Sequence, residues 1–376
     1  MSTVAVGVMS GTSLDGIDAV AVDFGPDIAA PRIEVLAHAH TDLAEPLRAE
    51  LLALNRSSSD EIHRAALAAN AMARASARLV NELLAKARLE RRAVAAIGCH
   101  GQTVRHRPGE FDGTGYTVQI NAPALLAELT GIDVVADFRS RDVAAGGQGA
   151  PLVPAFHAAA FGRAGEPLAV LNLGGIANLT CIDANRAIVG FDVGPANALL
   201  DGWSAAHTGQ RFDAGGAWAA SGRVDVRLLD ALLAEPYFAR SVPKSTGRDL
   251  FDAAWLETRL LASDARSRLR PEDVQATLAE LTAQTVADAL HRHAPAAREL
   301  VVCGGGAFNR DLMERLARRV PPVMLVDSGR RGLPPDQVEA CAFAWLARAF
   351  LSRLPGNIAS VTGAAGPRVL GALYPA

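Results

Sequence analysis

Small residues, hydroxyls and carboxylates gather in the segment SGTSLDGID, residues 10–18, between two apolar runs. Its two glycines allow backbone N–H groups to approach an anion closely, and Thr12 and Ser13 add two hydroxyl donors. Asp15 and Asp18 offer carboxylate oxygens that can hold Mg²⁺ through water. The segment therefore has the composition of a phosphate-binding hairpin, although a single glycine-rich hairpin is also typical of an ordinary tight turn.

Two more glycine-rich turns follow apolar runs later in the chain. The segment NLGGIAN, residues 172–178, joins two such runs, and three consecutive glycines at 304–306 come directly after LVVC. The triple glycine leaves room for a flat ligand, such as a nucleoside, to lie on the backbone. The chain contains neither GxxxxGK[ST] nor a GxGxxG after a strand. Three such loops favour a phosphate-bearing ligand over three ordinary turns.

A single aspartate is the best candidate for a general base. Asp192 follows the apolar run AIVGF and precedes Gly194 and Pro195, where we expect the chain to turn into a helix. Carboxylates at the carboxyl ends of strands in open α/β sheets face the ligand crevice, where a base is needed. Its position is equally compatible with a second role, as the N-terminal cap of that helix.

Polar side chains also gather between residues 99 and 141. The segment CHGQT follows the apolar run AVAAIG, and its His100 is also explained as a loop histidine with local partners. Amide, carboxylate and guanidinium groups suited to the hydroxyls and carboxylate of an acidic sugar come next. They are Gln119, Asn121, Asp137, Arg139 and Arg141.

Two further charged residues have two interpretations each. Glu339 stands three residues after Asp336, the spacing of a capping box at a helix start, and it is also a candidate to reach a binding cleft. Lys244, one of only two lysines, lies in the turn-prone stretch PKSTGRD. A lysine there either neutralises a phosphate or carboxylate or is an exposed loop residue.

The elements that must position these residues alternate between strand-like and helical patterns, the signature of an α/β fold. Apolar runs predict strands at residues 4–8, 18–24, 94–98, 168–173, 176–182, 187–191 and 299–303. Amphipathic patterns predict helices at 59–88, starting at Ser59, and at 196–207, 249–262, 271–293 and from about 308. The layout strand, glycine-rich turn, strand occurs near the start and again from Leu168, which predicts two similar halves that face each other.

Length and composition narrow the class of protein. The 376 residues suggest about two domains, and the glycine- and proline-rich segment 144–154 is either their junction or a long surface loop. A charged fraction of 20% and a formal charge of -3 exclude a disordered chain and argue against a dedicated nucleic-acid binder. No basic residue precedes Arg32 and no apolar run approaches about 18 residues, so we expect a cytoplasmic protein without a membrane span. The four cysteines lack metal-ligand spacing and are predicted to be buried, reduced thiols.

Taken together, the motifs closely resemble those of the anhydro-N-acetylmuramic acid kinases, in order and from residue 9 to the C-terminus. The segments are SGTSLDGID, CHGQTVRHRP, ADFRSRDVAAGGQGAP, NLGGIANLT, GFDVGPAN, PKSTGRDLF, CGGGAFN and PDQVEACAFAWLA. Val193 stands where the family usually has Thr, and Ala196 where it usually has Gly. The resemblance implies two duplicated actin-like (ribonuclease H-like) α/β domains with ATP clamped in the cleft between them. The expected domains are residues 1–143, joined by 354–376, and residues 144–353.

The resemblance also implies roles for individual residues. Asp192 would be the catalytic base that takes a proton from a water attacking C1 of the 1,6-anhydro sugar. ATP would be bound by Gly11, Thr12, Ser13, Leu14, Asp15, Gly16, Ile17, Asp18, Gly174, Gly175, Asn178, Gly304, Gly305 and Gly306. The sugar would be bound by Thr103, Gln119, Asn121, Arg139 and Glu339. Mg²⁺ would be held through water by Asp15 and Asp18.

The implied product is N-acetylmuramic acid 6-phosphate, which places the protein in peptidoglycan recycling and amino-sugar catabolism. The implied partners are ATP, Mg²⁺, a small amino sugar and a second copy in a homodimer, with no nucleic acid and no membrane. One alternative is a kinase of the same fold that acts on another sugar or polyol. The other is a chaperone-like or filament-forming ATPase, which would leave the polar cluster from His100 to Arg141 unexplained.

Overall fold

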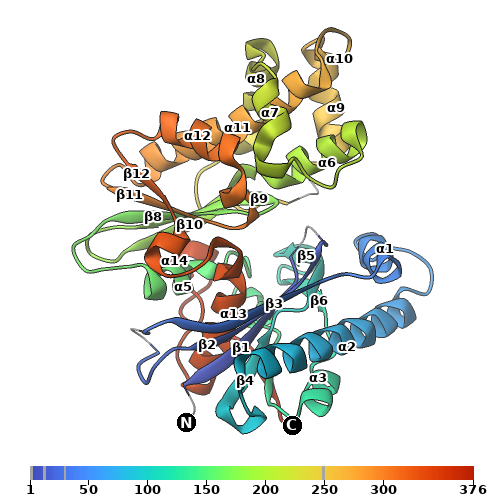
Figure 1. The fold of residues 1–376 in the computed structure, drawn as a ribbon, viewed down its shortest axis with the longest axis vertical. Helices are drawn as coiled ribbons and strands as arrows, with labels where there is room; N and C mark the ends of the chain where they lie inside the picture. The colour runs from blue at the N-terminus through green and yellow to red at the C-terminus, as the bar shows by residue number, and fades with distance from the viewer. Residues whose placement is uncertain (1–2, 12–13, 29–30, 248–249) are drawn as a thin grey trace. The chain divides into compact units, whose positions relative to one another are not determined.

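The chain is described here by a computed structural model that covers residues 3–11, 14–28, 31–247 and 250–376. It divides into two compact units. Unit 1 comprises Met1–Phe161 together with Gln337–Ala376, and unit 2 comprises Gly162–Asp336. Unit 1 therefore contains both the blue N-terminal and the dark red C-terminal parts of the ribbon in Figure 1.

Unit 1 is built on a six-stranded sheet with the order β13-β7-β4-β1-β2-β3. β1 pairs antiparallel with β2 and parallel with β4, so the sheet is mixed. A separate two-stranded hairpin, β5-β6, stands beside it. The strands are β1 (Val4–Met9), β2 (Gly16–Asp23), β3 (Glu34–Asp42), β4 (Val94–Cys99), β5 (Gln102–Pro108), β6 (Gly115–Ile120), β7 (Val134–Ala136) and β13 (Ala372–Tyr374).

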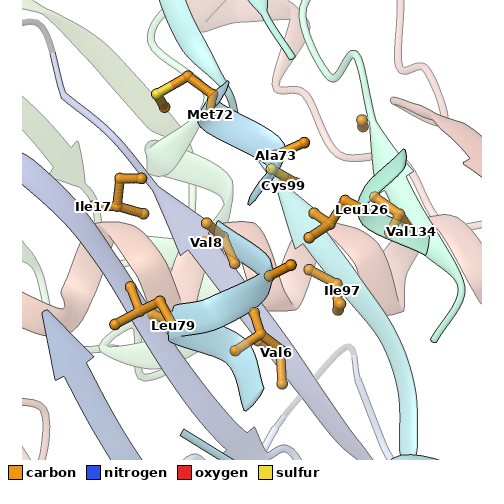
Figure 2. Packing of buried hydrophobic residues seen from close by; sticks show 14 of the residues in the cluster. Val6, Val8, Ile17, Met72, Ala73, Leu79, Ile97, Cys99, Leu126 and Val134 are labelled. Atoms are coloured by element: carbon orange, nitrogen blue, oxygen red, sulfur yellow. The ribbon is translucent and has the colours of Figure 1, made fainter. Parts of the chain in front are cut away.

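Two helices, α2 and α13, pack on this sheet. Leu79 and Met72 of α2 belong to one hydrophobic cluster with Val6, Val8 and Ile97 of the strands, as Figure 2 shows. α13 also packs on β1 and β4, at glycines whose lack of a side chain lets the backbones meet. The helices of unit 1 are α1 (Glu45–Ala53), α2 (Glu61–Ala87), α3 (Pro123–Thr130), α4 (Ser140–Ala144), α5 (Val153–Ala160), α13 (Val338–Leu351) and α14 (Ala359–Thr362).

Unit 2 repeats the same strand order. Its five-stranded sheet runs β10-β9-β8-β11-β12, in which β8 pairs antiparallel with β9 and parallel with β11, as β1 pairs with β2 and β4 in unit 1. The prediction of two similar halves is confirmed in this respect, and so is the fold class of duplicated actin-like α/β units. The strands are β8 (Leu168–Leu173), β9 (Ile176–Ile182), β10 (Ile188–Pro195), β11 (Glu299–Cys303) and β12 (Met324–Asp327).

The helices of unit 2 form two hydrophobic clusters, one beneath the sheet and one among the helices themselves. α11 contributes to both, because its 23 residues carry buried side chains along the whole length. The helices are α6 (Asn197–Thr208), α7 (Ala217–Ser221), α8 (Val226–Leu233), α9 (Ala253–Ala262), α10 (Ala265–Arg268), α11 (Pro271–His293) and α12 (Arg310–Arg319).

The division between the units differs from the boundaries expected at 143/144 and 353/354. Asp142 is fully buried, and its carboxylate accepts from the N–H of Gly149 at 2.7 Å and from the side chains of Asn357 and Thr362 at 2.6 and 2.7 Å. These charge-assisted bonds fix the segment after residue 144 to the C-terminal segment. The glycine-rich stretch is therefore an anchored loop of unit 1.

All the predicted elements occur, and the strands at 168–173, 176–182 and 299–303 and the helix at 271–293 have the expected bounds. The helix expected from Ser59 begins at Glu61 instead, after Asp60 in a left-handed conformation, and no side chain caps it. The helix expected from 249 begins at Ala253, because the side chain of Asp252 accepts from the N–H of Trp255 at 2.8 Å and caps it there.

Two predictions drawn from composition are also tested by the structure. All four cysteines are buried and unpaired to one another, as expected of reduced thiols. Across the described part of the chain, no helix combines the length and the apolar character that crossing a membrane requires.

Candidate functional site

The first glycine-rich segment forms the loop between β1 and β2, as predicted. Ser10 is buried at the end of β1, and its hydroxyl donates to Oε1 of Gln102 at 2.7 Å. Leu14 has a left-handed backbone with φ of 59°, and its N–H donates to the carbonyl of Gly11 at 3.2 Å. The loop is thus closed by its own backbone. Two predicted ATP-binding residues, Thr12 and Ser13, lie outside the described residues.

Asp18, on β2, is held by two histidines of the neighbouring strand β3. Its Oδ1 lies 3.1 Å from Nε2 of His38 and 2.9 Å from Nδ1 of His40. Burial lowers the pKa of His40, but the nearby carboxylates of Asp18 and Asp42 outweigh it, so the pKa is raised. Asp15 is exposed in the loop. Of the two expected Mg²⁺ ligands, one is therefore open to solvent and the other has an oxygen already bound to protein.

His100 follows β4 and forms a fixed pair with Arg139. Nε2 of His100 lies 3.1 Å from Nε and 3.0 Å from Nη2 of Arg139, and the histidine ring packs 4.6 Å from the ring of Phe343. Burial, reinforced by the positive charge of Arg139, lowers the pKa of His100 to about 3. A neutral ring can accept from Arg139, whose Nη1 also donates to the carbonyl of Gly149 at 2.8 Å. The guanidinium is thus fixed at both ends.

Three more of the expected sugar-binding residues lie around the β5-β6 hairpin. Nε2 of Gln119 donates to Oγ1 of Thr103 at 3.2 Å across the paired strands. Asn121 follows β6 directly, and its Nδ2 donates to the carbonyl of Cys99 at 3.4 Å. Burial raises the pKa of Cys99 to about 11, which keeps its thiol protonated. The β5-β6 hairpin therefore places the side chains of Thr103, Gln119 and Asn121 near the end of β4.

Glu339, the fifth expected sugar-binding residue, lies in the first turn of α13 and is half-buried. It precedes Phe343 by four residues, so both share one face of the helix, and Phe343 packs on His100. The predicted capping box at this helix start is wrong. The residue at the cap is Gln337, which makes no side-chain capping bond, and Asp336 lies in the preceding 3-10 turn (Pro335–Gln337).

In unit 2, the second glycine-rich turn connects β8 to β9 and is bound to the start of α6. The carbonyl of Gly174 accepts from the N–H of Asn197 at 3.1 Å, and that of Gly175 accepts from the N–H of Ala196 at 3.0 Å. The side chain of Asn197 also donates to the carbonyl of Leu173 at 2.9 Å. The turn is therefore held rigid by its own helix.

Three polar side chains form one row across the sheet of unit 2. Asn172, Asn178 and Asp192 stand directly opposite one another on β8, β9 and β10. Because side chains alternate between faces along a strand, this row points away from the hydrophobic core. The flanking positions belong to that core and include Leu171, Leu173, Ala177, Leu179, Phe191 and Val193.

Asp192 lies inside β10 rather than after it, next to a register shift between Asp192 and Gly194. The shift is an irregularity in the β10-β9 ladder, which is why the apolar pattern alone ended the strand too early. The alternative role of Asp192 as a helix cap is wrong, since the cap residue of α6 is Ala196 and no side chain caps that helix.

The segment after α8 surrounds Asp192 with hydrogen bonds. The N–H of Thr246 donates to Oδ2 of Asp192 at 3.0 Å, and the hydroxyl of Tyr237 donates to the Asp192 carbonyl at 2.7 Å. Lys244 is half-buried rather than exposed, and its Nζ donates to the carbonyls of Tyr237 and Phe238, both at 3.2 Å. Burial, aided by two nearby arginines, lowers the pKa of Lys244.

The triple glycine after β11 packs against the end of β8. Gly304 has φ of 82°, and a methyl group there would overlap Oδ1 of Asn172. A methyl group on Gly306 would stand 2.6 Å from Cβ of Leu173, whereas Gly305 has no such close neighbour. Two of the three glycines are thus required by packing within the unit, and Gly305 presents open backbone.

Comparison of the sequence with those of known proteins identifies the family of this chain. The family model described as anhydro-N-acetylmuramic acid kinase matches residues 3–376. The chain is 57% identical over 396 residues to the anhydro-N-acetylmuramic acid kinase of Albidiferax ferrireducens, covering 100% of both chains. It is 61% identical over 373 residues to that of Bordetella petrii, covering 99% of this chain and 96% of the relative. The chain belongs to the anhydro-N-acetylmuramic acid kinase family.

Among solved structures, the activator of the 2-hydroxyisocaproyl-CoA dehydratase from Clostridium difficile aligns with a TM-score of 0.48 and 12% identity, over 92% of this chain and 94% of that one. The assignment to the anhydro-N-acetylmuramic acid kinase family rests instead on the full-length sequence matches. The duplicated fold rests on the shared strand order of the two sheets.

Several contacts in this member of the anhydro-N-acetylmuramic acid kinase family were not predicted from the sequence. His38 and His40 were missed, although their spacing of two on a strand places both side chains on one face, where Asp18 pairs with them. The motif PKSTGRD predicted a role for Lys244, whereas Asp192 also accepts hydrogen bonds from Thr246 of that motif and from Tyr237, which precedes it.

The buried histidine gives this anhydro-N-acetylmuramic acid kinase family member a predicted pH dependence of stability. His100 has a pKa of about 3 when folded, against an unfolded value near 6.5, so the unfolded chain binds the proton first. The contribution is complete above pH 6.5 and is lost as the pH falls toward 3. We expect a loss of about 2 kcal/mol from this residue between pH 7 and pH 5, measured by denaturant unfolding.

Two histidine variants distinguish the contribution of His100 to this pH dependence from that of other titrating groups. His100→Asn should reduce the pH dependence, whereas His63→Gln on the exposed face of α2 should leave it unchanged. His157 is also buried with a pKa of about 3 and contributes in the same direction, while the raised pKa of the half-exposed His40 works in the opposite one. An unchanged slope in His100→Asn would contradict a neutral, buried His100.

Proposed function

We propose that this chain is an ATP-dependent kinase that opens the 1,6-anhydro ring of 1,6-anhydro-N-acetylmuramic acid and phosphorylates O6. The products are N-acetylmuramic acid 6-phosphate and ADP. The observation that carries the proposal is the family match over residues 3–376, with relatives of that name aligned along their full length. The reaction belongs to peptidoglycan recycling and amino-sugar catabolism.

Asp192 is proposed as the general base. A water molecule attacks C1 of the sugar and gives its proton to the Asp192 carboxylate, while the bond from C1 to the bridging oxygen breaks. That oxygen leaves as O6 and attacks the γ-phosphoryl group of MgATP, releasing ADP. The fixed carboxylate supports this role, because a base must be held in line with the proton that it takes. Positioning and charge neutralisation supply the rest of the acceleration, as in other phosphoryl transfers.

ATP is proposed to bind at the glycine-rich turns, whose backbone N–H groups suit phosphate oxygens. The residues are Gly11, Thr12, Ser13, Leu14, Asp15, Gly16, Ile17 and Asp18 of the first turn, Gly174, Gly175 and Asn178 of the second, and Gly304, Gly305 and Gly306 beside the adenosine. Mg²⁺ would arrive with the nucleotide and neutralise phosphate charge. The exposed Asp15 fits a water-mediated contact to it, and Asp18 fits only through the oxygen that its histidines leave.

The sugar is proposed to bind at the end of β4, where four candidate residues lie near one another. A guanidinium fixed at both ends, as in Arg139, is a suitable partner for the lactyl carboxylate. Thr103, Gln119 and Asn121 supply groups for hydroxyl and amide recognition, and Glu339 adds a carboxylate from α13. We also propose a cytoplasmic location, where ATP is available, and a homodimer in solution, which light scattering after gel filtration would measure.

The test is sugar-dependent release of ADP in water enriched in ¹⁸O. We expect turnover with the anhydro sugar and MgATP, and one ¹⁸O atom at C1 of the product. Turnover of xylulose, glycerol or N-acetylglucosamine without turnover of the anhydro sugar would instead indicate a kinase for another substrate. Label found only in phosphate would mean plain ATP hydrolysis and would overturn the proposed reaction.

A further inference from the structure

Thr246 has a buried hydroxyl that the fold itself does not use. Its Oγ1 is inaccessible to solvent and has no hydrogen-bond partner among the residues that the structure describes. A buried hydroxyl without a partner costs about 1–3 kcal/mol, so such a group is usually satisfied by water or a ligand. The backbone of Thr246, in contrast, has a partner, because its N–H donates to Oδ2 of Asp192 at 3.0 Å.

A second unused polar atom lies beside the same carboxylate. Oδ1 of Asn178 is also buried without a partner in the described part of the chain, and Asn178 stands directly opposite Asp192 in the β9-β10 pair. Side chains that are directly opposite on antiparallel strands point to the same face with Cβ atoms about 5 Å apart. Two oxygen atoms without hydrogen-bond partners among the described residues therefore lie near Asp192. One is Oδ1 of Asn178 on β9, and the other is Oγ1 of Thr246.

Covalent geometry keeps the Thr246 hydroxyl close to the Asp192 carboxylate. Oγ1 of any threonine lies within about 4 Å of its own backbone nitrogen. Since that nitrogen is 3.0 Å from Oδ2 of Asp192, the hydroxyl lies at most about 7 Å from this carboxylate oxygen, close to the roughly 6 Å that two hydrogen bonds through one water span. A water that bridges two protein groups in this way is held in a defined orientation.

The position of Thr246 is itself fixed by the neighbouring chain. The N–H of Asp192 donates to the carbonyl of Lys244 at 3.2 Å, two residues before Thr246. The hydroxyl of the buried Tyr237 donates to the carbonyl of Asp192, and the Lys244 ammonium donates to the carbonyl of Tyr237. Four residues thus brace one another around the carboxylate, which fixes the backbone that carries the Thr246 hydroxyl.

We propose that Thr246 is a further catalytic residue, whose hydroxyl holds the attacking water together with Asp192. This inference rests on the proposed function. The water donates one hydrogen to Asp192 and the other to Oγ1 of Thr246, which leaves a lone pair directed at C1. As the new bond from this oxygen to C1 forms and the bond from C1 to the bridging oxygen breaks, the first proton passes to Asp192. The second stays on the new C1 hydroxyl, and the bridging oxygen takes the γ-phosphoryl group from MgATP.

The test compares variants that remove or keep the hydroxyl in the full-length protein. Thr246→Val keeps the size and the backbone N–H that fixes Asp192, and removes only the hydroxyl. We expect its kcat with the anhydro sugar to fall at least tenfold, while the affinities for MgATP and sugar, measured by calorimetry with a non-hydrolysable ATP analogue, change less than threefold. Thr246→Ser should recover most of the loss. Thr258→Val, which loses an exposed hydroxyl bonded within α9, is the matched control and should match the wild type.

Each outcome of this test is decisive for Thr246. Near-normal kcat in Thr246→Val would overturn the role, and so would a rise in sugar KM with kcat unchanged, which would make the hydroxyl a binding group only. Equal losses in the Val and Ser variants, with a lowered midpoint of thermal unfolding, would assign the effect to packing. If the wild type itself fails to turn over the anhydro sugar, the proposed function fails instead.

Discussion

Replacing Asp192 by Asn should lower kcat at least about 10²-fold while leaving the fold and the binding of MgATP intact. The amide has nearly the same shape as the carboxylate and can still accept from the N–H of Thr246, so the local structure is retained. It cannot take a proton from the attacking water, and the loss of a positioned general base typically costs 10²–10⁴ in rate. Steady-state kinetics with the anhydro sugar and MgATP measure the effect.

A second aspartate in the same unit provides the control for this variant. Asp230 is exposed on α8, and Asp230→Asn removes the same charge away from the row of polar side chains on the sheet. We expect its kcat to match that of the wild type. An Asp192→Asn protein that retained near-normal turnover would remove Asp192 from the role of base and would leave the row Asn172, Asn178 and Asp192 without a catalytic group.

The largest expected effect on stability is that of Gly7→Ala. Gly7 lies in β1 where α13 crosses it, and a methyl group there would overlap the backbone oxygen of Ala340 and stand 2.8 Å from the backbone nitrogen of Ala344. Backbone atoms inside a helix cannot move aside without breaking the helix or shifting it off the sheet. We expect a loss of about 3 kcal/mol in the free energy of unfolding, the upper part of the range for overpacking.

Denaturant unfolding of the full chain measures this loss, and Gly202→Ala is the matched control. Gly202 lies inside α6 with nothing within 4 Å of the position where a Cβ would stand, so alanine there should raise stability by about 0.5–1 kcal/mol through helix propensity. If Gly7→Ala were as stable as the wild type, α13 would not rest directly on β1, and the close contact would have to be abandoned.

The strands of the central sheets were predictable because they are buried on both faces and read as continuous apolar runs. β8, β9 and β11 begin and end at the expected residues. β3 was not predicted, since its sequence EVLAHAHTD alternates apolar and polar residues at the sheet edge and carries two histidines. β7 and β12 are only three and four residues long, too short for any periodicity to stand out.

The candidate site was predictable as a set of loops but not as a set of contacts. Glycine spacing located the turns, because the requirement for small residues is local. The pairing of Asp18 with His38 and His40 spans about 20 residues and depends on the register of β2 against β3. The bond from Thr246 to Asp192 joins positions 54 residues apart, and no local pattern encodes which hydroxyl comes to lie beside which carboxylate.

The glycine contacts between β1, β4 and α13 have a consequence for the order in which the protein forms on the ribosome. Gly7 and Gly98 shape a surface for a helix that is made only after the whole of unit 2. At about 5–20 residues per second, the ribosome needs roughly 10–50 seconds to synthesise the chain between β4 and α13, and the surface stays uncovered during that time. Unit 2, whose residues are continuous, can complete its own sheet during this interval. The unit whose synthesis begins first is therefore completed last, and one face of its sheet stays uncovered until α13 has been made.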